Sequence, residues 1–195
     1  MKHALFEEGD GHTALPEEDR HGLIPTYIAT RGDLFEAEQR NIANALVRRH
    51  PSVATMLDDK YLRDLHHDMF GDVWKWAGHY RVRETNIGID PARIAISVRN
   101  LVGDAQAWIE FHAFDIDELA CRFHRRLVQI HPFPNGNGRH GRIATDLLLR
   151  AIGVAPFTWG RRTYSDTEEL RHTYLTALRR ADRGEVTELV AFARS

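Results

Sequence analysis

Residues 131–142 read HPFPNGNGRHGR, and they separate two segments whose apolar side chains recur at helical spacing. Residues 116–130 carry an apolar side chain every three or four positions, and residues 139–152 repeat the pattern. Gly153 follows the second segment as a helix stop signal. The sequence therefore predicts two helices that are joined by a loop rich in proline and glycine.

The loop has the composition of an anion-binding site. Gly136 and Gly138 flank Asn137 immediately before the second predicted helix. Glycine has no Cβ, so backbone N–H groups there can approach a ligand closely. A helix N-terminus adds unpaired N–H donors and partial positive charge, which together suit a phosphate. The alternative is an ordinary turn, which is the commoner role of an isolated Gly-Asn-Gly.

Three further side chains favour the binding site over the turn. Arg139 and Arg142 lie three residues apart in the first helical turn, so they share a face of the helix. Guanidinium groups bind phosphate through two parallel hydrogen bonds. His131 titrates near neutral pH and can take a proton from an attacking hydroxyl. This combination predicts a phosphoryl- or nucleotidyl-transfer site, where positioning and charge neutralisation supply most of the catalysis.

Composition narrows the class of protein. The 195 residues carry 26 Lys and Arg against 28 Asp and Glu, so bulk charge does not favour nucleic-acid binding. The single Cys121 excludes an intramolecular disulfide and a multi-cysteine zinc site. No apolar run approaches the roughly 20 residues of a membrane span, and the N-terminus has no secretory apolar region. We expect a soluble cytoplasmic protein with an N-terminal arm (1–22) and one domain (23–195, core about 55–195).

The rest of the chain reads mainly as α-helix. Isoleucines alternate with other residues around Asp90 and Pro91, which is typical of a short hairpin within residues 81–96. These isoleucines are Ile87, Ile89, Ile94 and Ile96. Further helices are expected over residues 34–49, 59–70, 98–111, 165–181 and 186–193. The fold class predicted is a mainly α bundle with one β-hairpin.

The string at 131–142 resembles the signature of Fic (filamentation induced by cAMP) proteins. The string LHHDMFGDVWKWAGHYR at 65–81 resembles the segment that enters the Fic core. The strings GLIP, TRGDLFEAEQRNI and FTWGR resemble one subgroup, usually called mobile mystery protein B. The resemblance covers residues from about 15 to 195 and implies a Fic-type helical bundle.

The resemblance also implies an activity, the transfer of AMP from ATP to a Ser, Thr or Tyr hydroxyl of a target protein. His131 would be the general base, Arg139 and Arg142 would bind the β- and γ-phosphates, and Phe133 would anchor the loop in the core. The hairpin would be a flap that docks the target by strand addition, through Ile87, Gly88, Ile89, Ile94 and Ile96. The implied nucleotide-binding residues are Asn135, Gly136, Asn137, Gly138, Arg139, Arg142, Tyr174 and Asp182.

Asn135 departs from the family pattern, in which this position usually carries an Asp or Glu that holds Mg²⁺. Asparagine offers a neutral carbonyl oxygen, a weaker ligand for a hard cation. We expect ATP as the substrate and Mg²⁺ as the cofactor. The Mg²⁺ concentration that this chain needs should be higher than in relatives with Asp at this position. The alternative function is a catalytically weak or silent nucleotide-binding module of a toxin–antitoxin-like pair, with a helix-turn-helix companion or antitoxin. Gly138 and Arg142 match the AMP-transferring branch of the family.

Many relatives carry an inhibitory helix whose glutamate pairs with the second arginine of the signature. Glu36 and Glu38, in the predicted helix 34–49, are the nearest candidates, and Glu38 is the possible inhibitory residue. The alternative is a capping residue and a solvated helix face. Removal of AMP by the same site is a third hypothesis that needs an activating glutamate. We expect no direct nucleic-acid or membrane binding, and the sequence leaves the target, the preferred base and the oligomeric state open.

Overall fold

The computed structural model describes residues 20–47 and 51–195, so nearly all of the predicted arm at 1–22 lies outside the described residues. The described chain is helical, which confirms the mainly α class. No helix in these two ranges has both the length and the apolar composition needed to cross a membrane. The elements are α2 (Arg31–Leu46), α3 (Val53–Met56), α4 (Asp59–Phe70), the 3₁₀-helix η2 (Pro91–Arg93), α5 (Ile94–Glu110), α6 (Ile116–Ile130), α7 (Asn137–Ile152), α8 (Thr167–Ala181) and α9 (Thr187–Arg194).

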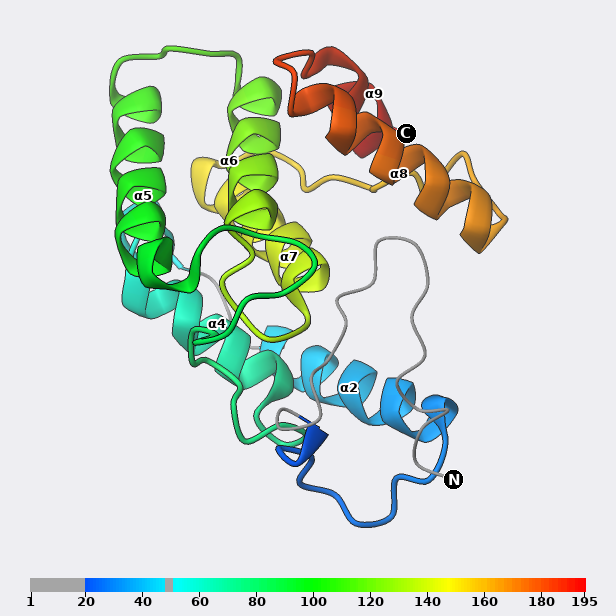
Figure 1. The fold of residues 1–195 in the computed structure, drawn as a ribbon. Coiled ribbons are helices and arrows are strands. Elements are labelled where there is room, and N and C mark those ends of the chain that lie inside the picture. The colour runs from blue at the N-terminus through cyan, green and yellow to red at the C-terminus, as the bar shows by residue number, and fades with distance from the viewer. Residues whose placement is uncertain (1–19, 48–50) are drawn as a thin grey trace.

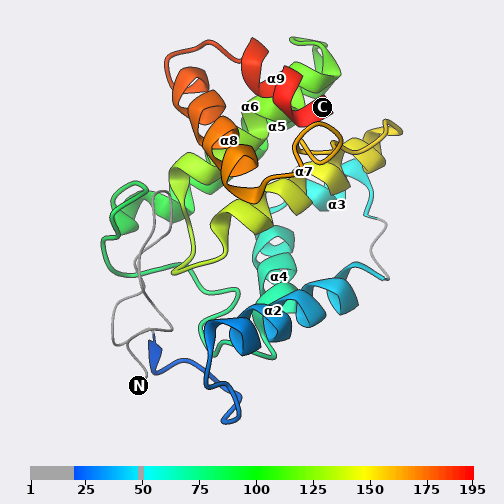
Figure 2. The same ribbon diagram turned by 90° about the vertical axis from the view of Figure 1, so that its right-hand side faces the viewer.

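The helices pack as pairs around α7. Helices α5 and α6 run side by side, and α6 packs along α7 (Figure 1). Helix α2 packs on α4, and α8 packs on α9. In Figure 2, α7 lies between the α8–α9 pair above and the α2–α4 pair below. The loop that joins α6 to α7 is therefore placed where both pairs can reach it.

Helices α6 and α7 each bury apolar side chains on two faces, because each helix packs against two apolar cores. Leu119, Phe123 and Leu127 of α6 belong to a core shared with α2, α4 and α5. Ala120 and Cys121 of α6 belong to a second core shared with α8 and α9. The α6–α7 pair is thus the common wall of the two cores, and burial on both sides holds the intervening loop in place.

Helix α2 begins earlier than the predicted residue 34. The Thr30 hydroxyl accepts a hydrogen bond from the Asp33 amide (3.1 Å), and the Asp33 carboxylate accepts one from the Thr30 amide (2.8 Å). This reciprocal capping box satisfies two of the amides that a helix N-terminus leaves unpaired. It places the helix start at Arg31, one turn upstream of the apolar pattern.

The predicted hairpin over residues 81–96 is wrong. No strand forms there, within the fully described range 51–195, and the isolated Leu23–Trp74 bridge is the β pairing of the described chain. Asp90 instead caps η2, with Pro91 in its first turn, and α5 follows directly. Proline suits the first helical turn because it has no N–H to satisfy.

The two isoleucines that follow Pro91 in the predicted hairpin, Ile94 and Ile96, lie on α5. Ile94 is fully buried at the start of a face that continues with Val98 and Leu101, which is helical rather than alternating periodicity. Ile96 lies in the same helix with its side chain exposed. Neither can belong to a hairpin flap, whereas Ile87, Gly88 and Ile89 lie in the preceding loop.

Candidate functional site

The loop from His131 to Gly136 starts and ends in left-handed backbone. His131 is the C-cap of α6 with φ of 54°, and Gly136 is the N-cap of α7 with φ of 79°. A Cβ on Gly136 would lie 2.7 Å from ring carbons of Phe70, so this position needs glycine for both conformation and space. The Asn137 side chain closes the loop internally, since it accepts from the Phe133 amide (2.9 Å) and donates to the Phe133 carbonyl (2.8 Å).

Phe133 anchors the loop in the core, as predicted, and a buried histidine supports it. The Phe133 ring is buried and stacks on His66 of α4, with ring centroids 3.7 Å apart. His66 Nδ1 accepts from the Gly78 amide, and Nε2 lies 3.0 Å from the Asn135 carbonyl oxygen, to which it donates. Burial holds the pKa of His66 well below its usual range, so the ring is neutral. Sequence reasoning assigned His66 no role, because this contact spans 69 residues.

His131 is neutral, as a general base must be, but its pKa lies below the near-neutral value expected from the sequence. Its residue is 5% exposed, and burial lowers the pKa of its imidazole to about 4. The Val128 carbonyl opposes this shift, and the positive charge of Arg81 adds to it. Nδ1 lies 3.3 Å from the Val128 carbonyl oxygen, so it carries the proton and Nε2 presents the basic lone pair. At pH 7 the ring is neutral and able to accept a proton.

The first turn of α7 leaves room for a ligand. A Cβ on Gly138 would meet nothing within 4 Å, in contrast to Gly136. The amides of Asn137, Gly138 and Arg139 come before the point at which intrahelical hydrogen bonds begin. Open space beside such amides, at the positive end of the helix dipole, is suited to an anion.

Arg139 extends from this turn toward α2 and α4. Its Nη1 lies 2.6 Å from Oε2 of Glu38, and its guanidinium lies over the Phe70 ring, 4.8 Å from the centroid. The other Glu38 oxygen accepts from the indole N–H of Trp74 at 2.7 Å. Glu38 is 7% exposed, so the interpretation of this residue as part of a solvated face is wrong. Glu36, by contrast, is exposed and pairs with Arg40 along the helix surface.

Arg142 extends toward α8 instead. Its guanidinium lies 5.3 Å from the centroid of the buried Tyr174 ring. The Tyr174 hydroxyl lies 2.8 Å from Nε2 of His124 on α6, in the core behind it. The neighbouring predicted residue, Asp182, caps α8 and pairs with Arg125 at 3.1 Å. The two arginines of the signature are thus held by different helices.

The segment Arg81–Ile89 lies against the same loop without forming a strand. The Arg81 amide donates to the Pro132 carbonyl (2.9 Å), and the Ile89 amide donates to the Ile130 carbonyl (3.4 Å). Gly88, with φ of 116°, passes so close that a Cβ would lie 2.7 Å from Cβ of His131. The structure therefore brings this segment to the histidine, while Ile94 and Ile96 belong to α5.

The described residues do not form a metal site by themselves. Among them no group of three His, Cys, Asp or Glu side chains could hold an ion. At the position predicted for Mg²⁺, Asn135 offers one neutral oxygen, and that oxygen already accepts from the Gly136 amide at 2.6 Å. A hard cation takes six or more oxygen ligands, so these residues alone do not fit one.

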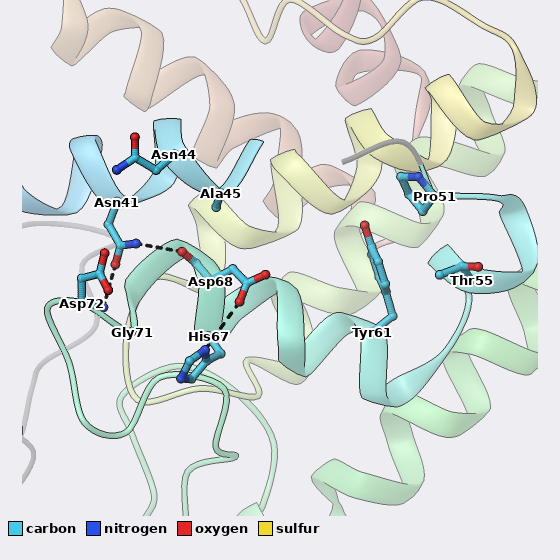
Figure 3. A pocket seen from close by; sticks show the side chains of 10 residues that line it. All are labelled: Asn41, Asn44, Ala45, Pro51, Thr55, Tyr61, His67, Asp68, Gly71 and Asp72. Atoms are coloured by element: carbon cyan, nitrogen blue, oxygen red, sulfur yellow. Dashed lines mark hydrogen bonds and ion pairs between the residues drawn. The ribbon is translucent and has the colours of Figure 1, made fainter. Parts of the chain in front are cut away.

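A groove of about 650 Å³ lies elsewhere, between α2, α3 and α4 (Figure 3). Asn41 spans its floor, donating to the Asp68 carbonyl (2.8 Å) and accepting from the Asp72 amide (2.9 Å). None of the residues that line it belongs to the 131–142 loop. The groove is therefore distinct from the candidate site, although it shares helix α2 with Glu38.

The Fic/DOC family model matches residues 56–149, which include α4 to most of α7 and the whole loop. This part of the chain is of the Fic/DOC family. The resemblance of the 131–142 string to the Fic signature is thereby confirmed, and the loop described above lies in the C-terminal part of the matched region.

Relatives with names extend this comparison. A protein adenylyltransferase Fic from Aedes aegypti is 27% identical over 164 residues, covering 81% of this chain and 30% of that protein. A probable protein adenylyltransferase from Aquifex aeolicus is 30% identical over 98 residues, covering 50% of this chain and 28% of that protein. This Fic chain spans less than a third of either relative.

A solved structure shares the fold. The BepC protein of Bartonella tribocorum with bound AMPPNP matches with a TM-score of 0.69 at 17% identity. The match covers 92% of this chain and 97% of that chain. The arrangement of α2 to α9 is therefore a known Fic fold.

Proposed function

We propose that this chain transfers AMP from ATP to a hydroxyl side chain of a target protein. The observation that carries the proposal is the neutral, buried His131 directly before a helix N-terminus with open space at Gly138. Two arginines begin in the same helical turn, which provides positive charge for a polyphosphate. The adenylyltransferase names of the relatives support the same reaction.

In this reaction Nε2 of His131 takes the proton of the target hydroxyl as its oxygen attacks the α-phosphorus. The new bond joins that oxygen to phosphorus, and the bond from the α-phosphorus to the bridging oxygen breaks. Pyrophosphate leaves with its negative charge neutralised by Arg139, Arg142 and the first-turn amides of α7. These groups act by positioning and by electrostatic stabilisation of the developing charge. Asn135 is the residue that would contact a Mg²⁺ ion carried by ATP, and the ion would add charge neutralisation there.

The target segment docks, in this proposal, along Ile87, Gly88 and Ile89. Their closeness to His131 is the supporting observation, since Gly88 lies next to its Cβ. Tyr174 contributes by packing under Arg142. An adenine pocket at Tyr174 and Asp182, a helix-turn-helix companion and a cytoplasmic location stay predictions.

Glu38 restrains the site, in this proposal. The Glu38 carboxylate, 2.6 Å from Nη1 of Arg139, competes with a γ-phosphate for this guanidinium. The family pattern implies pairing with the second arginine of the signature, which is Arg142 here. The contact observed is with the first, so the restraint in this chain would act on the neighbouring arginine.

The test is incubation with α-labelled ATP, Mg²⁺ and cell lysate, for the unmodified protein beside His131→Ala. A labelled protein band that disappears in the variant supports AMP transfer. Incorporation that persists in His131→Ala would contradict the assigned base. Labelled GTP, CTP and UTP in parallel determine which base the site accepts.

A second function has one specific observation in its favour. The neutral Asn135 oxygen is already hydrogen-bonded, which weakens support for a metal-assisted reaction. A catalytically silent module would bind ADP, measured by calorimetry, with the affinity of a substrate site. It would nevertheless label no protein, even when the Glu38→Gly variant is used. Labelling by that variant would exclude it.

A further inference from the structure

Arg81 is a buried arginine that the proposed reaction does not use. It is 4% exposed and lies in the turn after α4, 50 residues before His131. Burial lowers the pKa of its guanidinium, while the carboxylates of Asp90 and Glu84 oppose that shift from a distance. A buried charge is costly unless it is hydrogen-bonded, so the partners of this group identify its role.

Among the described residues, the hydrogen-bond partners of the Arg81 guanidinium are backbone carbonyls. Nε donates to the His131 carbonyl at 2.7 Å, and Nη1 donates to the Arg83 carbonyl at 2.9 Å. Nη2 donates to the Ile89 carbonyl and, at 3.4 Å, to the Ile130 carbonyl. One planar group therefore joins both ends of the segment 83–89 to the C-terminus of α6.

The position of these carbonyls matters for the base. Ile130 and His131 end α6, where the last carbonyls lack intrahelical donors and the helix dipole is negative. His131 has left-handed backbone, with φ of 54°, which disfavours a side chain with Cβ. The Arg81 fork binds the carbonyl of that same residue, so it stabilises the backbone that aims the imidazole.

Gly88 allows the segment 83–89 to lie close to both Arg81 and His131. A Cβ there would lie 2.5 Å from Nη2 of Arg81 and 2.7 Å from Cβ of His131. The segment thus passes directly over both side chains, at a separation that the hydrogen bonds of Arg81 fix. Lysine could retain the charge, but its single nitrogen cannot bind carbonyl groups from three separate backbone segments in one plane.

We propose that Arg81 is a positioning residue that holds the target-docking segment and His131 in one fixed register. The proposal rests on the AMP transfer proposed above. It assigns Arg81 no contact with ATP or the target. Its effect would pass through the carbonyls that it binds, so that a hydroxyl delivered by the segment reaches the imidazole.

The first test does not depend on activity. Hydrogen–deuterium exchange is compared for the unmodified protein, Arg81→Lys and the matched surface control Arg99→Lys. The proposal expects faster exchange confined to residues 82–89 and the end of α6 in Arg81→Lys alone. Unchanged exchange there would overturn it, and so would an increase spread evenly over the chain, which indicates a merely structural role.

The second test measures labelling with α-labelled ATP in a Glu38→Gly background, divided by the stoichiometry of ADP binding. This division corrects the labelling rate for any loss of folded protein. We expect Arg81→Lys to keep the KM for ATP and to lose on the order of 10²-fold in normalised rate, as small misplacements of a base do. A rate equal to that of Arg99→Lys would overturn the proposal. If the Glu38→Gly parent labels nothing, AMP transfer fails, and the exchange result still decides the role of Arg81.

Discussion

The two arginines of the 131–142 signature, Arg139 and Arg142 in α7, differ in what holds them. Arg139 lies between the Phe70 ring and the buried Glu38, so it already has an anionic partner. Arg142 lies against the Tyr174 ring and has a partner without charge. A phosphate must displace a carboxylate from the first arginine, whereas the second keeps its aromatic neighbour when phosphate binds.

This difference suits each flank of α7 to a different proposed role in phosphate binding. In the proposed reaction the α2–α4 flank would control access, because its carboxylate competes with phosphate for Arg139. The α8 flank would provide the anion site that needs no displacement, because a ring stabilises Arg142 without neutralising it. Helix α2 joins the rest of the molecule mainly through α4, so a shift of one helix could release the restraint.

Acidification tests both flanks and has the largest expected effect, because each contains buried neutral histidines. Burial depresses the pKa of these rings, to about 3 or 4 for three of them. The unfolded chain binds protons at its ordinary pKa of about 6.5, so stability is present above that pH and is lost as pH falls toward the folded values. The four rings are His66, His124, His131 and His140.

Each histidine should cost about 1.4 kcal/mol of unfolding free energy per pH unit below 6.5. Asp146 acts oppositely, because burial raises its pKa to about 6 and the folded state binds its proton first. Urea unfolding at pH 7, 6 and 5 measures the slope. His124→Asn should reduce it, and the exposed His67→Asn should not. A flat profile from pH 7 to 5 would contradict the neutral buried rings.

The two glycines should separate folding from binding. Gly136→Ala forces a Cβ against Phe70 in left-handed backbone and should cost about 3 kcal/mol of unfolding free energy. Gly138→Ala enters open space and should leave stability unchanged, but should weaken ADP binding about tenfold by occupying the phosphate position. Chemical denaturation and calorimetric titration measure the two effects. The reverse ranking would contradict the assignment of the open space to phosphate.

Truncating the arginines should reveal the asymmetry in stability. Arg139→Ala leaves the buried Glu38 carboxylate with Trp74 alone and should cost about 2 kcal/mol, since the arginine is a quarter exposed. Arg142→Ala loses an aromatic contact and should cost about 0.5–1 kcal/mol. Adding Glu38→Gln to Arg139→Ala should recover most of the loss in a double-mutant cycle. Equal costs for the two arginines would remove the distinction between the flanks.

The smallest effect is expected at Asn135. A carboxylate is a stronger ligand for Mg²⁺ than an amide oxygen. Asn135→Asp should therefore raise labelling a few-fold at low Mg²⁺ and leave it unchanged at saturating Mg²⁺. The check is a Mg²⁺ titration of the labelling rate for both proteins. Superimposable titration curves would show that this position does not hold the metal.

Local patterns predicted the loop and the helices other than the four-residue α3, because apolar periodicity and the Gly-Asn-Gly string lie within one turn or two of chain. They failed at residues 81–96, where Ile87 and Ile89 belong to a loop and Ile94 and Ile96 to α5, one buried and the other exposed. They also failed at Glu38, because the buried face of α2 includes Glu38 and Asn41. Their partners lie 101 and 27 residues away, and polarity along one helix cannot reveal such contacts.

The release of Arg139 by Glu38→Gly tests the central claim most directly. Glu36→Gly is the matched control, since Glu36 lies on the same helix but is exposed and pairs with Arg40. Both variants introduce glycine into α2, and Glu38→Gly alone removes the buried carboxylate that pairs with Arg139 and Trp74.

The measurement is the initial rate of incorporation from α-labelled ATP by the unmodified protein and the two variants. We predict a rate at least about tenfold higher for Glu38→Gly, as expected when an ion pair of roughly 1.4 kcal/mol no longer competes with phosphate. Glu36→Gly should match the unmodified protein. Equal rates for all three proteins, with ADP bound equally well, would contradict the claim that Glu38 restrains the site.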